Sequence, residues 1–203
     1  MTVVTIQASA NITDTNIRSA TPTLNASTDA GIYIGELNTG ANVTRGLIKF
    51  DLSSIPANAT ISSAVLSIKA INDYCDNART WRVYRVLRAW VGSQVTWNVY
   101  STGNDWGTAG CSNTSTDREA TDIGTRDFSA AETVPEFKNF SLTASKIQEM
   151  TAGTFTNNGF LIQVDTESDD SYNFASSENG TEADNPKLVI TYTLPGGGFF
   201  ALL

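Results

Sequence analysis

GLIKFDLSSIPANATISSAVLSIKA, residues 46–70, predicts two β-strands joined by a compact turn. The bulky residues of LIKF favour the first strand, and the Ser-, Pro- and Asn-rich link over residues 53–58 favours a turn. In the second half of the stretch, apolar residues alternate imperfectly with Ser and Lys, which is the pattern of a strand with one buried face. We therefore expect this pair of strands to form the centre of an all-β core.

The composition of the 203-residue chain agrees with this expectation, because Thr, Val, Ile, Ser, Asn and Gly are abundant. A chain of this size can bury roughly 70% of its unfolded surface in one domain. Many short apolar runs separated by turn residues favour a jelly-roll β-sandwich over a parallel sheet. We predict an all-β jelly roll of antiparallel strands with one short helix, as one domain over residues 1–194 followed by a Gly-hinged apolar tail over residues 195–203.

The other predicted elements follow from local pattern. Further strands are expected over residues 2–8, 32–36, 160–164, 172–174 and 188–192, and polar, turn-rich loops over residues 13–28 and 102–127. The run ASKIQEMTAG predicts the helix, with Thr143 as its N-cap, Ile147 and Met150 on one face, and Gly153 at its end.

The stretch TWRVYRVLRAWV, residues 80–91, fits two structures. Its apolar spacing is that of an amphipathic helix, whereas its Trp, Tyr and Val content favours a strand. We expect a strand over residues 81–87 and a turn near Trp90. We expect the arginines of this stretch to be solvated or paired with carboxylates, and an anion-binding site is the alternative.

The net charge of −8 and the absence of histidine exclude several classes of protein. An acidic surface disfavours nucleic acid and anionic membranes as partners, and no apolar run approaches the roughly 20 residues of a membrane span. Without histidine, Ser/His/Asp and Cys/His hydrolases and most zinc sites are excluded, whereas catalysis by a pair of carboxylates is not. Residues 1–10 do not resemble a signal peptide. Cys75 and Cys111 lie in turn-like settings and are compatible with either a disulfide or two separate thiols.

Three places are candidates for function. Trp106, in the loop GNDWGTAG, is the candidate for stacking on a sugar ring, whereas the other three tryptophans are expected to pack in the core. The acidic loop DTESDD offers oxygen ligands for a structural Ca²⁺ ion, and it also fits a solvated loop or, more weakly, the carboxylate pair of a glycosidase. Its candidate ligands are Asp165, Glu167, Asp169 and Asp170. The candidate partner-docking residues of the tail are Phe199, Phe200, Leu202 and Leu203.

Several segments of the chain together resemble the DNRLRE domains, which are related to a family of carbohydrate-binding modules and to disaggregatase-associated domains. These segments are RGLIKFDLSSIPANATISSAVLSIKA, VYRVLRAW, VTWN (residues 95–98) and PKLVITY (residues 186–192), and the resemblance extends over about residues 8–192. It implies a non-catalytic jelly-roll sandwich of the kind found on secreted enzymes, cell-surface proteins and bacteriophage particles.

The resemblance, the lack of an export signal and the apolar tail together suggest a structural or adhesive protein displayed on a particle surface. The specific expectation is a bacteriophage virion component, either a capsid decoration or a tail-associated protein, located on the virion or another extracellular surface. Its expected partners are a protein assembly, such as a capsid, a tail or neighbouring copies, and a surface polysaccharide. The alternative is a secreted carbohydrate-binding module that recognises polysaccharide.

Overall fold

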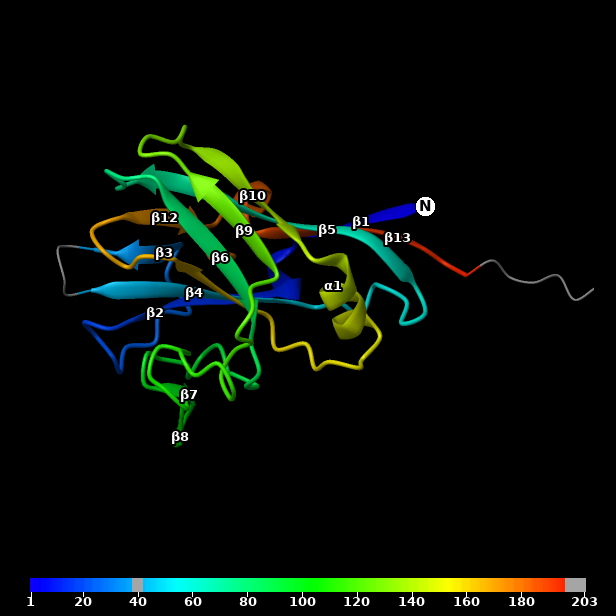
Figure 1. Cartoon of the computed structure of the whole chain (residues 1–203), viewed down its shortest axis with the longest axis horizontal. Helices are drawn as coiled ribbons and strands as arrows, with labels where there is room; N and C mark the ends of the chain where they lie inside the picture. The colour runs from blue at the N-terminus through cyan, green and yellow to red at the C-terminus, as the bar shows by residue number, and fades with distance from the viewer. Residues whose placement is uncertain (38–41, 196–203) are drawn as a thin grey trace, which may run out of the picture.

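The computed structural model of the chain describes residues 1–37 and 42–195 (Figure 1). The strands are β1 (Thr2–Ile6), β2 (Ile12–Arg18), β3 (Gly31–Glu36), β4 (Val43–Phe50), β5 (Thr60–Asp73), β6 (Arg79–Arg85), β7 (Val99–Ser101), β8 (Asn104–Asp105), β9 (Gly124–Phe128), β10 (Glu136–Leu142), β11 (Phe160–Val164), β12 (Ser171–Ala175) and β13 (Lys187–Thr193). The helices are α1 (Ala144–Thr151) and the short 3-10 turns η1 (Ser9–Asn11) and η2 (Glu182–Asp184).

The strands form two antiparallel layers, which confirms the predicted β-sandwich. One layer has the order β2-β4-β11-β6-β9. In the other layer, the 14-residue strand β5 pairs with β10 along one side and with β13 and β12 along the other, and β1 and β3 follow outside them. A short contact between β3 and β4 joins the layers into one curled sheet.

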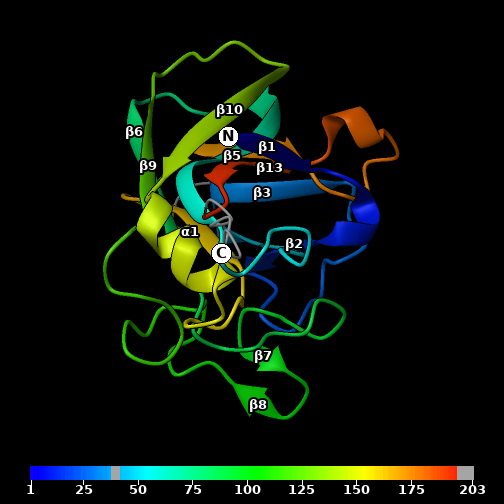
Figure 2. The ribbon, with the colours of Figure 1, turned by 90° about the vertical axis from the view of Figure 1, so that its right-hand side faces the viewer.

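The inner core lies between these layers. Strands of the first layer contribute Ile48, Trp81 and Ile162, and strands of the second contribute Leu66 and Phe174, all at most 1% exposed. Burial of this much aromatic and aliphatic surface is the main source of stability for a sandwich. The helix α1 adds to the same core, and Figure 2 shows it at one end of the molecule, beside β5 and β13.

An outer core covers the opposite face of the first layer. Leu47, Tyr84 and Leu161 alternate with inner-core residues along β4, β6 and β11, so their side chains leave the layer on its other side. The long connection over residues 86–123 folds over this face and buries Trp90 and Trp106 against it. In Figure 1 this connection, with β7 and β8, lies below the sandwich. A layer buried on both faces explains why these strands are apolar at successive positions.

The strands predicted within residues 46–70 exist, but they do not pair with each other. β4 pairs with β2, β3 and β11, whereas β5 pairs with β10, β12 and β13. The turn after Phe50 carries the chain from one layer to the other, so the stretch forms a corner of the sandwich. The central role of the two strands is correct, and the expectation that they form one strand pair is wrong.

Other predictions of elements were partly wrong. Residues 13–28 were expected to be a loop, yet Ile12–Arg18 forms β2, in which residues 14–17 are all buried despite three polar side chains. The predicted loop over residues 102–127 contains β8 and most of β9. Thr143 occupies the N-cap position of α1, as predicted, but its Oγ1 donates to the carbonyl of Ile123 at 3.0 Å and makes no capping hydrogen bond to the helix.

The remaining predictions from the sequence concern the end of the helix, membrane-spanning segments and the C-terminal tail. Gly153 follows α1 with φ +75°, as expected for a helix-terminating glycine. Within the described residues, no helix is long and apolar enough to cross a membrane. The tail residues Phe199, Phe200, Leu202 and Leu203 lie outside the described residues, so their predicted docking role stays a prediction.

Candidate ligand-binding site

Trp106 is buried in the outer core, and only 5% of it is exposed. Its indole Nε1 donates to the carbonyl of Thr96 at 3.0 Å, and its ring lies 5.7 Å from the ring of Tyr100. The other tryptophans also contact one of the cores, as expected for packing residues. Because the Trp106 ring is covered by protein, its position does not support the predicted stacking on a sugar.

The residues of the acidic loop contact different parts of the protein. Glu167 forms a two-pronged ion pair with Arg45, with N–O distances of 2.6 and 2.8 Å. The backbone N–H of Asp169, a residue with φ +51°, donates to Glu36 of β3. Asp165 lines a separate small depression beside β6.

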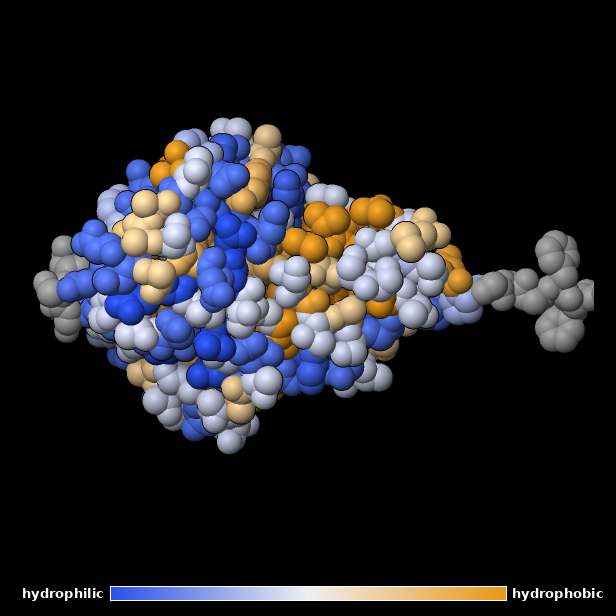
Figure 3. Space-filling model, turned by 45° about the horizontal axis from the view of Figure 1, so that its top comes forward, coloured by the Kyte–Doolittle hydropathy of each residue, from blue (hydrophilic) through white to orange (hydrophobic). Residues whose placement is uncertain are grey.

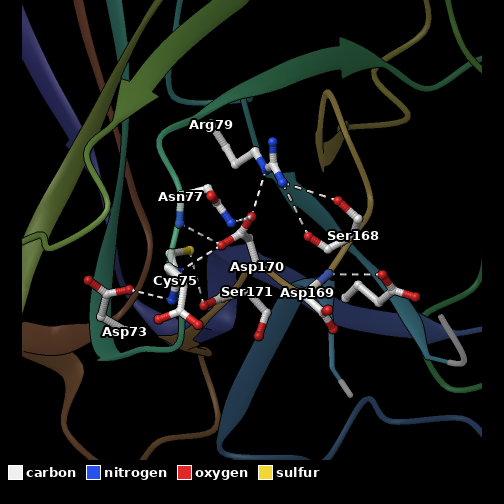
Figure 4. Close-up of polar contacts among 10 residues, drawn as sticks. Asp73, Cys75, Asn77, Arg79, Ser168, Asp169, Asp170 and Ser171 are labelled. Atoms are coloured by element: carbon white, nitrogen blue, oxygen red, sulfur yellow. Dashed lines mark hydrogen bonds and ion pairs between the residues drawn. The ribbon is translucent and has the colours of Figure 1, made fainter. Parts of the chain in front are cut away.

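Asp170 connects the acidic loop to the loop after β5 (Figure 4). Its side chain is fully buried and accepts hydrogen bonds from the backbone N–H groups of Asp76 and Asn77 and from Arg79 Nε, at 2.8, 3.0 and 2.6 Å. Burial alone would raise the pKa of Asp170, but these donors outweigh it and hold the pKa below its usual value. The carboxylate is therefore a charged structural link between two loops.

Cys75 lies beside this link, and its thiol contacts the carbonyl of Ser171 at 3.5 Å (Figure 4). Burial, with Asp73 and Asp170 nearby, raises the pKa of the Cys75 thiol to about 12. A thiol with such a pKa remains protonated at neutral pH and is a poor nucleophile or metal ligand.

These contacts do not assemble the predicted calcium site. Two of its four proposed ligands, Glu167 and Asp170, are neutralised by arginine, and Asp165 lines a separate depression. Among the residues that the structure describes, no group of three or more His, Cys, Asp or Glu side chains is arranged to hold a metal ion. The acidic loop instead fixes the ends of β3, β5, β6 and β12 relative to one another.

An open depression of about 510 Å³ lies on the outer face of the second layer, over β3, β12 and β5. We call it the Tyr33 groove. Tyr33 of β3 and Asn173 of β12 are cross-strand neighbours, and both side chains point outward because the residues on either side of each are buried. The other lining residues are Thr28, Asp29, Ala30, Gly31 and Ile71.

An ion pair lies at one side of the Tyr33 groove. Arg18 of β2 pairs with Asp29, and its guanidinium carbon lies 5.9 Å from the centroid of the Tyr33 ring. The Asp29 side chain keeps 43% of its exposure, so its carboxylate remains accessible at the groove. Arg18 thus contacts both the Tyr33 ring and the Asp29 carboxylate, and it helps to fix the orientation of these two groups in the groove.

The amide of Asn173 lies within the same groove. Its Nδ2 donates to Asn72 at 3.4 Å, whereas its Oδ1 is buried and has no partner among the described residues. This oxygen lies directly against Gly31, where the Cβ of any other residue would collide with it. A buried acceptor without a partner costs free energy. Because this oxygen is buried, a ligand hydroxyl group would reach it only after the Asn173 side chain changes its rotamer.

Two other depressions offer less suitable chemistry. One, of about 180 Å³, lies between β6 and β9 and includes Asp127, whose carboxylate already accepts the Thr80 hydroxyl at 2.6 Å. The other, of about 470 Å³, lies between the turn after β4 and helix α1, and it has no aromatic side chain. The Tyr33 groove is the one of these three that combines an accessible carboxylate with a tyrosine ring and a side-chain amide, that of Asn173.

The sequence contained part of the information needed to find the Tyr33 groove. Tyr33 interrupts a run of buried residues in GIYIGE, and Asn173 does the same in SYNFA, so alternation alone predicts that both side chains face outward. Nothing local indicates that two segments about 140 positions apart pair side by side. Strand order was the missing information.

The fold and the groove define a jelly-roll β-sandwich module with an accessible polar and aromatic surface on one layer. A comparison with protein families gives the particular family: the chain belongs to the disaggregatase related repeat domains, with residues 14–190 matched. No curated protein matches the chain. The family match supports the kinship with disaggregatase-associated domains that the sequence suggested, and the narrower assignment to DNRLRE domains stays a prediction.

Proposed function

We propose that the chain is a non-catalytic module that binds polysaccharide through the Tyr33 groove. The observation that carries this proposal is that a tyrosine ring, an accessible carboxylate and the Asn173 side chain line one open depression. An aromatic face covers the apolar C–H face of a sugar ring, and carboxylate and amide groups hydrogen-bond to neighbouring hydroxyl groups. An open groove suits a chain of sugars better than a small enclosed ligand.

A binding role also agrees with the small number of potential catalytic groups around the Tyr33 groove. The chain has no histidine, and among the residues that the structure describes Asp29 is the one carboxylate that lines the Tyr33 groove. Glycoside hydrolysis generally requires two carboxyl groups on opposite sides of the scissile bond. Because Asp29 stands alone there and is paired with Arg18, we assign it to recognition.

The proposal places the module on an extracellular surface, where polysaccharide is accessible. The family match gives no support for a bacteriophage virion, and the apolar tail that motivated that expectation lies outside the described residues. We therefore propose display of a polysaccharide-binding module and do not extend the proposal to a capsid or phage tail.

Binding to a panel of immobilised polysaccharides and to soluble oligosaccharides tests the proposal. The wild type is expected to bind at least one glycan, and Tyr33→Ala is expected to weaken that binding at least roughly fivefold, because removal of a stacking ring costs about 1 kcal/mol or more. Asn173→Ala is expected to weaken it as well.

Tyr74→Ala is the matched control, because Tyr74 is 49% exposed and does not line the groove. Binding by this variant should equal that of the wild type. No binding by the wild type to any glycan, or unchanged binding by both groove variants, contradicts the proposal. Release of reducing sugar by the wild type would contradict its non-catalytic part.

A further inference from the structure

The strand β1 has one side that no other described strand covers. It pairs with β13 over five consecutive positions, from Thr2 opposite Tyr192 to Ile6 opposite Leu188, and it stands last in the order of its layer. The N–H and C=O groups on its other side have no strand partner among the described residues. Such a side is a template for one more strand.

This open side lacks the usual protection of a sheet edge. The sequence TVVTI of β1 has no charged residue and no proline, and the register with β13 shows no bulge. The strand at the end of the other layer, β9, is different, because it carries Arg126 and Asp127. Charged residues on an edge oppose pairing with another chain, and β1 has none.

Hydrophobic side chains surround the open side. Met1 is 90% exposed, Val3 62% and Leu194, just after β13, 54%. In Figure 3 the half of the molecule that holds β1 and β13 shows most of the hydrophobic surface, and the other half is largely hydrophilic. Exposed apolar surface of this kind is typical of an interface.

The charge distribution favours a second copy of the chain at this place. The protein carries a net charge of −8, so most of its surface repels another copy, yet no charged side chain occurs before Asp14. β1 is thus a part of the surface where two copies can approach without opposing like charges. A partner selected by charge, by contrast, would find nothing on this strand to recognise.

The sequence of β1 also complements itself. Two copies of one strand that pair antiparallel are related by a two-fold axis perpendicular to the sheet, so each residue must face a residue of the same side of the layer. Centring the axis on the middle residue places Val4 opposite Val4 of the second copy, Val3 opposite Thr5, and Thr2 opposite Ile6. Every pair is then β-branched, which suits cross-strand packing.

We propose that two copies of this chain associate through the open side of β1 and form one sheet that is continuous across both. The same two-fold axis keeps the outer faces of the two layers on one side of the assembly. The two Tyr33 grooves, which lie on these outer faces, would face the same way. This last consequence rests on the proposed function, because only a polysaccharide ligand would use both grooves at once and gain avidity.

Sedimentation equilibrium of the full chain, over low to high micromolar concentrations, tests the association. The wild type is expected to be a dimer, and Val3→Lys is expected to weaken the dimer at least roughly tenfold, because the two ammonium groups would lie diagonally across the interface on the same face of the joint sheet and repel each other. Leu24→Lys is the matched control: Leu24 is 44% exposed and lies away from β1, so this variant should dimerise like the wild type. Thermal unfolding of each variant verifies that it is folded.

A cysteine variant tests the register. Val4→Cys should form an intermolecular disulfide under mild oxidation, because directly opposed residues of antiparallel strands have the spacing that a disulfide requires. Leu24→Cys should not. A wild type that stays monomeric, a Val3→Lys variant that dimerises like the wild type, or a Val4→Cys variant that does not cross-link overturns the proposal.

Glycan binding separates this proposal from the proposed function. If the grooves bind glycan, Val3→Lys should keep the wild-type affinity for a soluble oligosaccharide and lose affinity for an immobilised polysaccharide. If the wild type and Val3→Lys bind the immobilised polysaccharide equally well, the inference that the two grooves face the same way is wrong. A dimer that binds no glycan would leave the β1 interface supported and the proposed function refuted.

Discussion

At the scale of single residues, Asp14 of β2 is a buried carboxylate with incomplete hydrogen bonding. Its Oδ2 accepts the N–H of Ser177 at 2.8 Å, and its Oδ1 has no partner among the described residues. Burial raises the pKa of Asp14 from 3.8 to about 6, against the opposing effect of the hydrogen bond from Ser177. The folded state therefore holds its proton more tightly than the unfolded state does.

Replacement of Asp14 by Asn should stabilise the protein at neutral and alkaline pH. A raised pKa means that ionisation costs the folded state free energy once the pH exceeds about 4, and the cost becomes complete above about pH 6. We expect Asp14→Asn to raise the free energy of unfolding at pH 8 by about 1–3 kcal/mol and to have a smaller effect at pH 4. Urea unfolding at pH 4, 6 and 8 measures the difference.

An exposed carboxylate provides the control for this experiment. Asp105 of β8 is exposed, and Asp105→Asn should change the unfolding free energy by less than about 0.5 kcal/mol at each pH. A difference between Asp14→Asn and wild type that does not grow from pH 4 to pH 8 would show that ionisation of Asp14 does not limit stability.

Glu132 shows the opposite behaviour. Burial acts to raise the pKa of Glu132, but the backbone N–H of Ser129 and the fully buried ammonium of Lys138 outweigh it and bring the pKa to about 2. Lys138 also donates to the carbonyl of Thr133 and to Glu136. The contrast with Asp14 shows that complete hydrogen bonding, and not burial alone, decides which charges this fold tolerates.

At the scale of elements, the long connection over residues 86–123 depends on Arg45 of β4. This side chain donates to the carbonyl of Gly110 at 2.6 Å and to Ser112, forms the ion pair with Glu167, and lies 5.0 Å from the ring of Trp97. Arg45 thus connects the acidic loop, the first layer and the covering connection.

Replacement of Arg45 by Met should loosen the connection and leave the sandwich intact. The buried carbonyl of Gly110 and the carboxylate of Glu167 would lose their donors, and loss of one partner of a buried pair costs about 3–5 kcal/mol. Hydrogen exchange should show faster exchange of the backbone amides over residues 106–118, whereas the amides of β5 and β13 stay protected up to the global limit.

Arg82 of β6 provides the matched control, because it pairs with Asp122 near the surface and keeps 35% of its side-chain exposure. Arg82→Met should cost less than about 1 kcal/mol and leave the exchange of residues 106–118 unchanged. Uniformly faster exchange in Arg45→Met, including β5 and β13, would refute a local role for Arg45.

The elements also show what the sequence could and could not predict. Turn residues and runs of β-prone apolar residues correctly placed β1, β3, β6 and β11, because both are visible in the local sequence. The strand β2 was missed because Asp14, Thr15 and Asn16 are polar although buried, which hides the alternation.

Partners were harder to predict than elements. The stretch over residues 46–70 resembled a strand pair because its two strands are consecutive, yet β4 and β5 lie in different layers. Trp106 was a sugar-stacking candidate because its loop is polar, and its burial depends on contacts with the distant β4, β6 and β11. The Tyr33 groove combines β3 with β12 in the same way. The strand partners of β4 and β5, the burial of Trp106 and the Tyr33 groove all depend on pairing between segments far apart in the sequence, which the local sequence pattern does not indicate.

At the scale of the whole molecule, two cores share one layer of sheet, and each contains one cysteine. Cys75 lies in the inner core and Cys111 in the outer core, and both are free thiols. The possibility of a disulfide between them, left open by the sequence, is not realised. The stability of the fold therefore depends on apolar burial on both faces of this layer and not on a covalent link.

This arrangement predicts that the folded protein is indifferent to reducing agents. Burial raises the pKa of both thiols, to about 12 for Cys75, and Cys111 is further affected by Asp117, so neither forms the reactive thiolate at neutral pH. The midpoint of thermal unfolding should be the same with and without dithiothreitol. A thiol reagent should react with two thiols only after unfolding, whereas Leu24→Cys, with its exposed position, should add one thiol that reacts at once. Rapid reaction of a wild-type thiol under native conditions would show that one of the two cores opens independently of the other.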